Sequence, residues 1–186
     1  LQILGEHQLM NAAATLAVSS KLGIPIVEAI AALAELPLAE RWRMQLFNLP
    51  NGVSVINDAY NASPDSMKAA LQTLAAIGRG SRRTIAVLGE MAELGSFSRE
   101  AHDEIGRLVV RYNIDQLVVV GEAAKLIHLG AMQEGSWDGE SVFFSAGSEA
   151  LDYIRGILEP GDIVLVKSSK SANLRFMGDD LAEVKS

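Results

Sequence analysis

Beyond about residue 41, short apolar runs alternate with longer segments whose apolar residues recur at helical spacing. The expected strands are 41–47, 52–58, 84–89, 116–121, 141–145 and 162–168. The expected helices are 65–77, 98–112, 123–132, 148–158 and 173–184. This alternation predicts an α/β fold in which a mostly parallel sheet carries helices on both faces. The first two strands are separated by Pro50, Asn51 and Gly52, a turn typical of a β-hairpin.

The first part of the chain has a different pattern. Apolar residues fall on one helical stripe over residues 7–22, and a second stripe over 26–36 stops at Pro37. Two such helices form a hairpin that is too short to be a domain by itself. We therefore expect a helical segment over residues 1–39 and an α/β domain over residues 40–186.

Composition and charge exclude several classes of protein. A chain of 186 residues with 49% hydrophobic content can bury a full core. Its net charge of -7 argues against binding to duplex nucleic acid or to an anionic membrane, since either partner needs a basic face. No segment approaches the roughly 18 apolar residues of a membrane span, and the absence of cysteine excludes disulfides and thiol catalysis. We expect a cytoplasmic protein that binds small molecules.

A polar turn, NDAYNASPDSM at residues 57–67, follows one of the expected strands and leads into a helix. Its side chains Asp58, Asn61, Ser63 and Asp65 can converge at the carboxyl end of the strand. Ligands of open α/β sheets bind at that edge, and a helix that begins there directs unpaired backbone N–H groups toward an anion. This turn is therefore the main candidate for a functional site.

A second candidate is the loop KSSKS, which follows the last expected strand. Its two ammonium groups and three hydroxyls would suit a carboxylate or a phosphate, although a solvated loop with ordinary lysines is an equal alternative. Lys167 directly follows a buried strand, so its charge needs a partner, which would most naturally be anionic.

Several common cofactor motifs do not occur. No G-x-G-x-x-G follows a strand, which disfavours a dinucleotide oxidoreductase, and no G-x-x-x-x-G-K-[ST] is present. A nucleotide could still meet this chain if the phosphate-binding loop came from elsewhere. The three histidines lack the spacing of zinc ligands, and we expect no metal site in this chain.

Five segments, in this order and spacing, resemble the Mur ligases: GEHQLMNAAATLA, RWRM, INDAYNASPDSMKAAL, VLGEMAELG and VLVKSSKSANL. Members of this family have an N-terminal domain for a UDP-sugar, a central ATPase domain and a C-terminal Rossmann-like domain. The resemblance covers essentially the whole chain and implies that residues 1–39 are the helical end of the ATPase domain. The phosphate loop and the Mg²⁺ ligands would then lie upstream of Leu1, so we expect no catalytic residue here and no activity from this fragment alone.

The DAYNASPDSM and LGEMAELG versions of the turns look like those of the members that join D-alanyl-D-alanine to UDP-N-acetylmuramoyl-tripeptide in peptidoglycan precursor synthesis. The resemblance implies ATP-driven amide formation with Mg²⁺. The tripeptide carboxylate becomes an acyl phosphate, and the amine of the dipeptide attacks it with loss of phosphate. Such a reaction needs charge neutralisation and positioning more than an acid–base pair.

The resemblance also implies roles for residues that match the family's nucleotide site. Asn11 matches an asparagine whose amide reads the adenine, whereas Gln8 replaces a second asparagine of that segment. Arg43 matches an arginine that reaches the nucleotide phosphates when the domains close, with Arg41 as the competing candidate.

The polar turn completes this expected nucleotide site and adjoins the expected acceptor site. Asp58 matches the carboxylate that binds the ribose hydroxyls, and Asn61 lies where sister enzymes place a polar residue on the nucleotide or substrate side. We expect Asp58→Ala to raise the Michaelis constant for ATP with little change in folding. The residues expected to face the dipeptide are Ser63, Asp65, Lys167, Lys170 and Ser171.

The competing hypothesis is a free-standing α/β module that binds a small anion or a partner protein without catalysis. A phosphate loop in frame ahead of Leu1 would favour the ligase, and a start codon at that position would favour the module.

Overall fold

The computed structural model describes residues 7–36, 41–135, 137 and 140–183. The helices are α1 (His7–Lys21), α2 (Ile26–Glu35), α3 (Pro64–Gly78), α4 (Ser98–Arg111), α5 (Lys125–Met132), α6 (Gly147–Ile157) and α7 (Leu174–Leu181). The strands are β1 (Gln45–Asn48), β2 (Ser54–Asn57), β3 (Thr84–Leu88), β4 (Gln116–Val120), β5 (Glu140–Phe144) and β6 (Ile163–Lys167). Short 3₁₀ turns occur at η1 (Gly95–Phe97), η2 (Glu122–Ala124) and η3 (Lys170–Ala172). Every strand and helix expected after residue 52 is present, with bounds shifted by a few residues at most.

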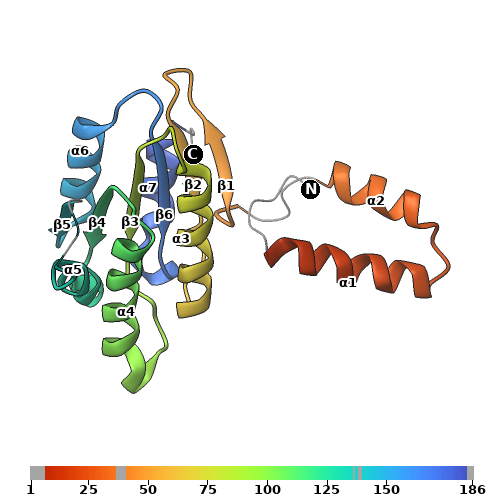
Figure 1. The fold of residues 1–186 in the computed structure, drawn as a ribbon, viewed down its shortest axis with the longest axis horizontal. Coiled ribbons are helices and arrows are strands. Elements are labelled where there is room, and N and C mark those ends of the chain that lie inside the picture. Colours follow the sequence, from red (N-terminus) through yellow and green to blue (C-terminus); the bar gives the residue numbers. More distant parts are fainter. Residues whose placement is uncertain (1–6, 37–40, 136, 138–139, 184–186) are drawn as a thin grey trace.

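The strands form one six-stranded sheet in the order β1-β2-β6-β3-β4-β5 (Figure 1). β1 and β2 are the expected antiparallel hairpin, and every other neighbouring pair is parallel. The predicted mostly parallel α/β sheet is thus confirmed. β6 lies between β2 and β3, an arrangement that brings the loops after these three strands together at one edge of the sheet.

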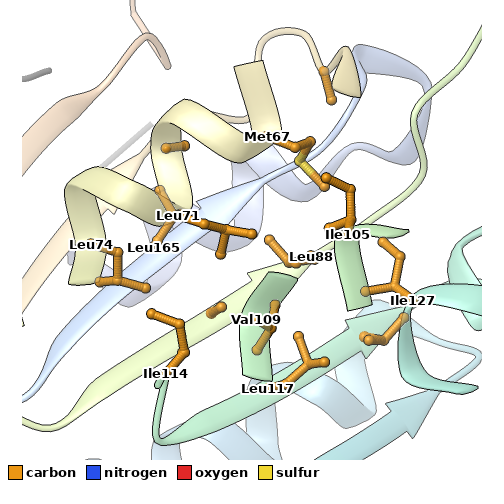
Figure 2. Close-up of a cluster of buried hydrophobic side chains, with 14 of the residues drawn as sticks. Met67, Leu71, Leu74, Leu88, Ile105, Val109, Ile114, Leu117, Ile127 and Leu165 are labelled. Atoms are coloured by element: carbon orange, nitrogen blue, oxygen red, sulfur yellow. The ribbon is translucent and has the colours of Figure 1, made fainter. Parts of the chain in front are cut away.

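Helices cover both faces of the sheet and bury a separate core on each. α3, α4 and α5 pack on one face, against side chains that include Ile56 and Leu165, while α6 and α7 pack on the other, against Val55 and Val166. Neighbouring residues of one strand enter opposite cores because side chains alternate along a strand. Figure 2 shows the first core, in which Leu71 of α3 lies over the sheet. Burial of a side chain of this size stabilises the fold by about 1.5–3 kcal/mol.

Helices α4 and α5 cross at two glycines. A Cβ atom on Gly106 would lie 2.0 Å from the backbone oxygen of Ile127, and one on Gly130 would lie 2.4 Å from that of Asp103. Real Cβ atoms do not approach backbone atoms so closely. The absence of a side chain at both positions is therefore what allows these two helices to pack backbone against backbone.

The expectation of a strand over 41–47 is wrong for its first residues, because β1 begins only at Gln45. Trp42 and Met44 have φ angles of 63° and 46°, in the left-handed region and far from the angles of a regular strand. The Trp42 indole Nε1 donates a hydrogen bond of 2.9 Å to Asp179 of α7. The chain is thus anchored to α7 and turns sharply before it enters the sheet.

The first two helices form the expected hairpin, which lies apart from the sheet and its covering helices in Figure 1. Ala29 is the one buried residue of α2, and exposed large apolar side chains occur along both helices, including Met10, Leu22 and Val27. No helix in the described part of the chain has the length and apolar character needed to cross a membrane. The boundary expected between residues 39 and 40 lies outside the described residues.

Candidate functional site

A cavity of about 410 Å³ opens at the carboxyl edge of the sheet, beside the turn after β2. We call it the carboxyl-edge cavity. Its walls come from α1, the segment before β1, the turn after β2, the start of α3 and the end of β6. The residues that line it are Gln8, Arg43, Met44, Asp58, Asn61, Ser63, Asp65, Ser66, Ala69, Ala70 and Lys167. Most of the residues singled out in the sequence are therefore gathered around one space.

Lys167 ends β6, and its side chain is only 2% exposed. Its Nζ donates to Oδ2 of Asp58 at 2.5 Å and to the backbone oxygen of Asn61 at 3.1 Å. The other carboxylate oxygen of Asp58, Oδ1, accepts the backbone N–H of Met44 at 2.9 Å. The anionic partner expected for Lys167 is thus Asp58. Since each carboxylate oxygen has two lone pairs, Asp58 retains capacity to accept a ligand hydroxyl.

The N-terminus of α3 borders the cavity and has a complete side-chain cap. The backbone N–H of Ser66 donates to Ser63 Oγ at 3.4 Å, and that of Ser63 donates to Ser66 Oγ at 2.9 Å. Pro64 occupies the first helical position, where no N–H is needed. Asp65 lies in the first turn, where the helix dipole favours its charge. Ser63 therefore both caps the helix and lines the cavity.

Asn11 does not line the carboxyl-edge cavity but supports a residue that does. Its side-chain Nδ2 donates to Oε1 of Gln8 at 2.8 Å, one turn earlier on α1. Gln8, which we expected to stand where the resembling family has an asparagine, is the residue at the cavity wall. The two amides thus form a connected pair on the α1 side of the cavity.

Lys170 and Ser171 lie outside this cavity, in η3 after β6. The Ser171 hydroxyl donates to the carboxylate of Glu90, in the loop after β3. Lys170 Nζ lies 5.7 Å from the centroid of the Tyr60 ring, and Arg43 Cζ lies 4.5 Å from the same centroid. Tyr60 therefore connects the cationic residues of two loops through cation–π contacts. Sequence reasoning missed Tyr60, although it stands inside the polar turn.

Ser169 joins the three loops at this edge. Its backbone N–H donates to the oxygen of Glu90 at 2.8 Å, and its Oγ accepts the N–H of Ala92 at 2.8 Å. The same hydroxyl donates to the oxygen of Ala62 at 3.4 Å. The loops after β2, β3 and β6 are therefore held in one arrangement.

His102 of α4 holds the LGEMAELG loop through a buried hydrogen bond. It is 1% exposed, and its Nε2 accepts the backbone N–H of Met91 at 2.9 Å. Its Nδ1 lies 2.6 Å from the backbone oxygen of Ser98 and donates to it. One nitrogen accepts and the other donates, which is the pattern of the tautomer that carries its proton on Nδ1.

A smaller cavity of about 250 Å³ lies next along the same edge, between the loops after β3, β4 and β5. Glu90 is on its wall, together with Gly121 and Ser145. Because Glu90 also holds Ser171, η3 reaches this second space. Among the residues that the structure describes, no group of three or more His, Asp or Glu side chains is arranged to hold a metal ion.

Comparison with known proteins decides the family. The sequence model of a protein family described as "Mur ligase, glutamate ligase domain" matches residues 42–170. The chain belongs to this Mur ligase family. A UDP-N-acetylmuramoyl-tripeptide–D-alanyl-D-alanine ligase of Mycobacterium leprae is 44% identical over 97% of this chain and 38% of the relative. The ligase of that name from Bacillus subtilis is 34% identical over 98% of the chain and 39% of the relative.

Solved structures of Mur ligases have the same fold. The MurF ligase of Thermotoga maritima in complex with ADP aligns with a TM-score of 0.79 and 25% identity, over 98% of this chain and 39% of that one. A MurF structure from Acinetobacter baumannii aligns with a TM-score of 0.80 and 28% identity, over 96% of this chain and 38% of that one. The resemblance to the Mur ligases is thus confirmed. This Mur ligase chain spans less than two fifths of the length of these relatives.

Proposed function

We propose that this chain is the C-terminal part of an ATP-dependent ligase that adds D-alanyl-D-alanine to UDP-N-acetylmuramoyl-tripeptide. Two observations support the proposal. Relatives named for this reaction match the chain almost from end to end, and the residues shared with the family's motifs gather at one edge of the sheet. The free-standing binding module is the alternative, and it predicts no turnover from any longer protein that contains this chain.

The carboxyl-edge cavity offers groups that suit an adenosine phosphate. Gln8 presents an amide, which can both donate to and accept from a purine. Asp58 presents a carboxylate for the ribose hydroxyls, and the guanidinium of Arg43 carries the charge that phosphates require. The contact with Tyr60 and the ion pair with Lys167 hold these two groups before a ligand enters. ATP would supply the phosphoryl group that activates the tripeptide carboxylate.

The acceptor dipeptide would lie on the η3 side of this edge. Lys167 is neutralised by Asp58 and therefore acts by positioning that carboxylate. Lys170 is exposed and forms no ion pair among the described residues, so it is the better counter-ion for the carboxylate of D-alanyl-D-alanine. Ser171, held by Glu90, would add a hydrogen bond. Ser63 and Asp65 line the carboxyl-edge cavity at the start of α3 and would contact the dipeptide from that side.

Residues 1–39 would be the helical end of the preceding ATPase domain. The apolar side chains exposed along α1 and α2 support this, because a hairpin with so little burial needs further protein to cover it. The Mg²⁺ ligands and the phosphate loop would belong to that same domain. This division would make the carboxyl-edge cavity one half of a cleft that spans two domains.

Steady-state kinetics of the full-length protein test the acceptor assignment. Lys170→Gln should raise the Michaelis constant for D-alanyl-D-alanine by about tenfold or more, because a charge-assisted hydrogen bond is lost, and should leave that for ATP unchanged. Lys125→Gln, an exposed lysine on α5, is the matched control and should change neither constant. An unchanged Michaelis constant for the dipeptide in Lys170→Gln would contradict the assignment, and absence of any ligation by the wild type would support the module.

A further inference from the structure

A second large cavity, of about 870 Å³, opens at the opposite, amino edge of the sheet. It lies between the turn that joins α3 to β3 and the turn that joins α4 to β4. Four arginines line it: Arg79, Arg82, Arg83 and Arg111. We call it the arginine cavity. This concentration of cations is notable in a chain whose net charge is -7, and the proposed ligase reaction makes no use of it.

Two of the four charges are neutralised by neighbouring carboxylates. Arg83 forms a two-pronged ion pair with Asp162, at 3.0 Å from Nε and 2.7 Å from Nη2. Arg111 shares the carboxylate of Glu134 with Arg107, at 3.1 and 3.3 Å. These pairs build the wall of the cavity but leave little charge for a ligand.

The other two charges are not compensated. Arg82 donates from Nε to the backbone oxygen of Gly161 at 2.7 Å, and from Nη2 to that of Asp162 at 2.8 Å and to Ser54 Oγ at 3.0 Å. All of these acceptors are uncharged, so the guanidinium keeps its full positive charge. Arg79 is exposed and forms no ion pair with any described residue.

Arg82 is held ready for a ligand. Its hydrogen bonds use Nε and Nη2, while Nη1 donates to none of the described residues. The half-buried side chain therefore loses little further entropy when an anion binds. The Tyr112 hydroxyl accepts from Gln72 Nε2 at 3.1 Å and still has its own proton to donate. The carboxylate of Asp115, also on the wall, accepts the N–H and hydroxyl of Thr84. It keeps its single negative charge, which the two uncompensated arginines outweigh.

We propose that the arginine cavity binds a small molecule that carries at least two phosphate groups. Guanidinium groups match phosphate oxygens in charge and in geometry. A space of about 870 Å³ falls in the upper range of small-molecule sites and exceeds what a single phosphate fills. The site is distinct from the carboxyl-edge cavity, which lies at the other end of the same strands.

The test is calorimetric titration of the full-length protein with inorganic pyrophosphate and, separately, with ADP. Arg79→Ala should weaken pyrophosphate binding by about tenfold or more, because it removes an uncompensated cation. Its thermal midpoint should not change, since Arg79 is exposed. Arg99→Ala, an exposed arginine at the start of α4, is the matched control and should bind like the wild type.

Hydrogen exchange then locates the bound anion. Pyrophosphate should protect residues 78–84 and not residues 57–67. If pyrophosphate protects residues 78–84, the diphosphate group is sufficient for binding. If only ADP protects them, binding also requires the nucleoside. The proposal is overturned if neither pyrophosphate nor ADP protects residues 78–84, or if Arg79→Ala leaves pyrophosphate binding unchanged. Because the readout is binding, its failure would leave the proposed ligase function untouched.

Discussion

Lys167 and Asp58 form a largely buried ion pair at the carboxyl end of the sheet. The lysine is 2% exposed and the aspartate 13%, so neither charge is well solvated. Removal of one member of a buried ion pair leaves an uncompensated charge, which costs about 3–5 kcal/mol. This ion pair therefore links the stability of the fold to the geometry of the candidate nucleotide site.

This link changes the expected behaviour of Asp58→Ala. The sequence alone led us to expect little effect on folding, but the structure places the carboxylate against a buried ammonium group. We now expect Asp58→Ala to lower the free energy of unfolding by about 3–5 kcal/mol in urea titrations. The double variant Asp58→Ala/Lys167→Met should recover part of this loss. Equal stability of the wild type and Asp58→Ala would contradict the account.

His128 gives the fold a pH dependence. Burial and, second, the nearby charge of Lys125 lower the pKa of His128 from its ordinary value of 6.5. The unfolded chain then binds a proton at His128 more readily than the folded chain does. The free energy of unfolding is therefore unaffected by His128 above about pH 6.5 and declines as the pH falls toward the folded pKa. In urea titrations His128→Gln should show a shallower loss of stability below pH 6.5. Parallel curves for the two proteins would rule out this contribution.

The order of the strands in the sheet decides which loops meet. Local hydrophobic periodicity predicts where strands and helices occur, and the predicted segments after residue 52 are all present. Strand pairing depends on long-range contacts that no local pattern encodes. The sequence therefore predicted that Asp58 and Lys167 lie at the same edge of the sheet, but not that they form an ion pair. It did not predict that Ser169 connects the loops at this edge. A serine in a polar loop gives no signal that it holds three loops together.

The same limit explains the error before β1. The alternating letters of RWRMQLF resemble a strand, but Trp42 and Met44 adopt left-handed backbone angles. Contacts with distant residues, such as that between Trp42 and Asp179, override the local pattern. A prediction from neighbouring residues alone has no access to them.

Alanine substitution tests the glycine contact between α4 and α5. Gly106→Ala should destabilise the fold by about 3 kcal/mol or more, because the new Cβ would lie 2.0 Å from the Ile127 oxygen. Gly156→Ala in α6 is the matched control. A Cβ atom on Gly156 would have no neighbour within 4 Å, so this substitution should be neutral or stabilise by up to about 1 kcal/mol. Urea unfolding of both variants measures the difference, and similar stabilities would argue against tight helix packing at Gly106.

For the whole molecule, the two edges of one sheet carry two different cavities. The carboxyl edge presents the residues of the Mur ligase motifs, with Gln8 of α1 on the far wall. The amino edge presents arginines that the family motifs do not include. The hairpin α1–α2 stands away from the sheet (Figure 1) and exposes much of its apolar surface. This arrangement fits the proposal that a second domain packs against the carboxyl edge.

Turnover by the full-length protein tests whether this edge forms the acceptor side of a D-alanyl-D-alanine ligase. The most direct measurement is phosphate release by the full-length protein supplied with ATP and UDP-N-acetylmuramoyl-tripeptide, with D-alanyl-D-alanine or single amino acids as acceptors. We expect release that depends on the dipeptide and is at least about a hundredfold faster than with any single amino acid. Equal rates with a single amino acid, or no ligation with any acceptor, would contradict it.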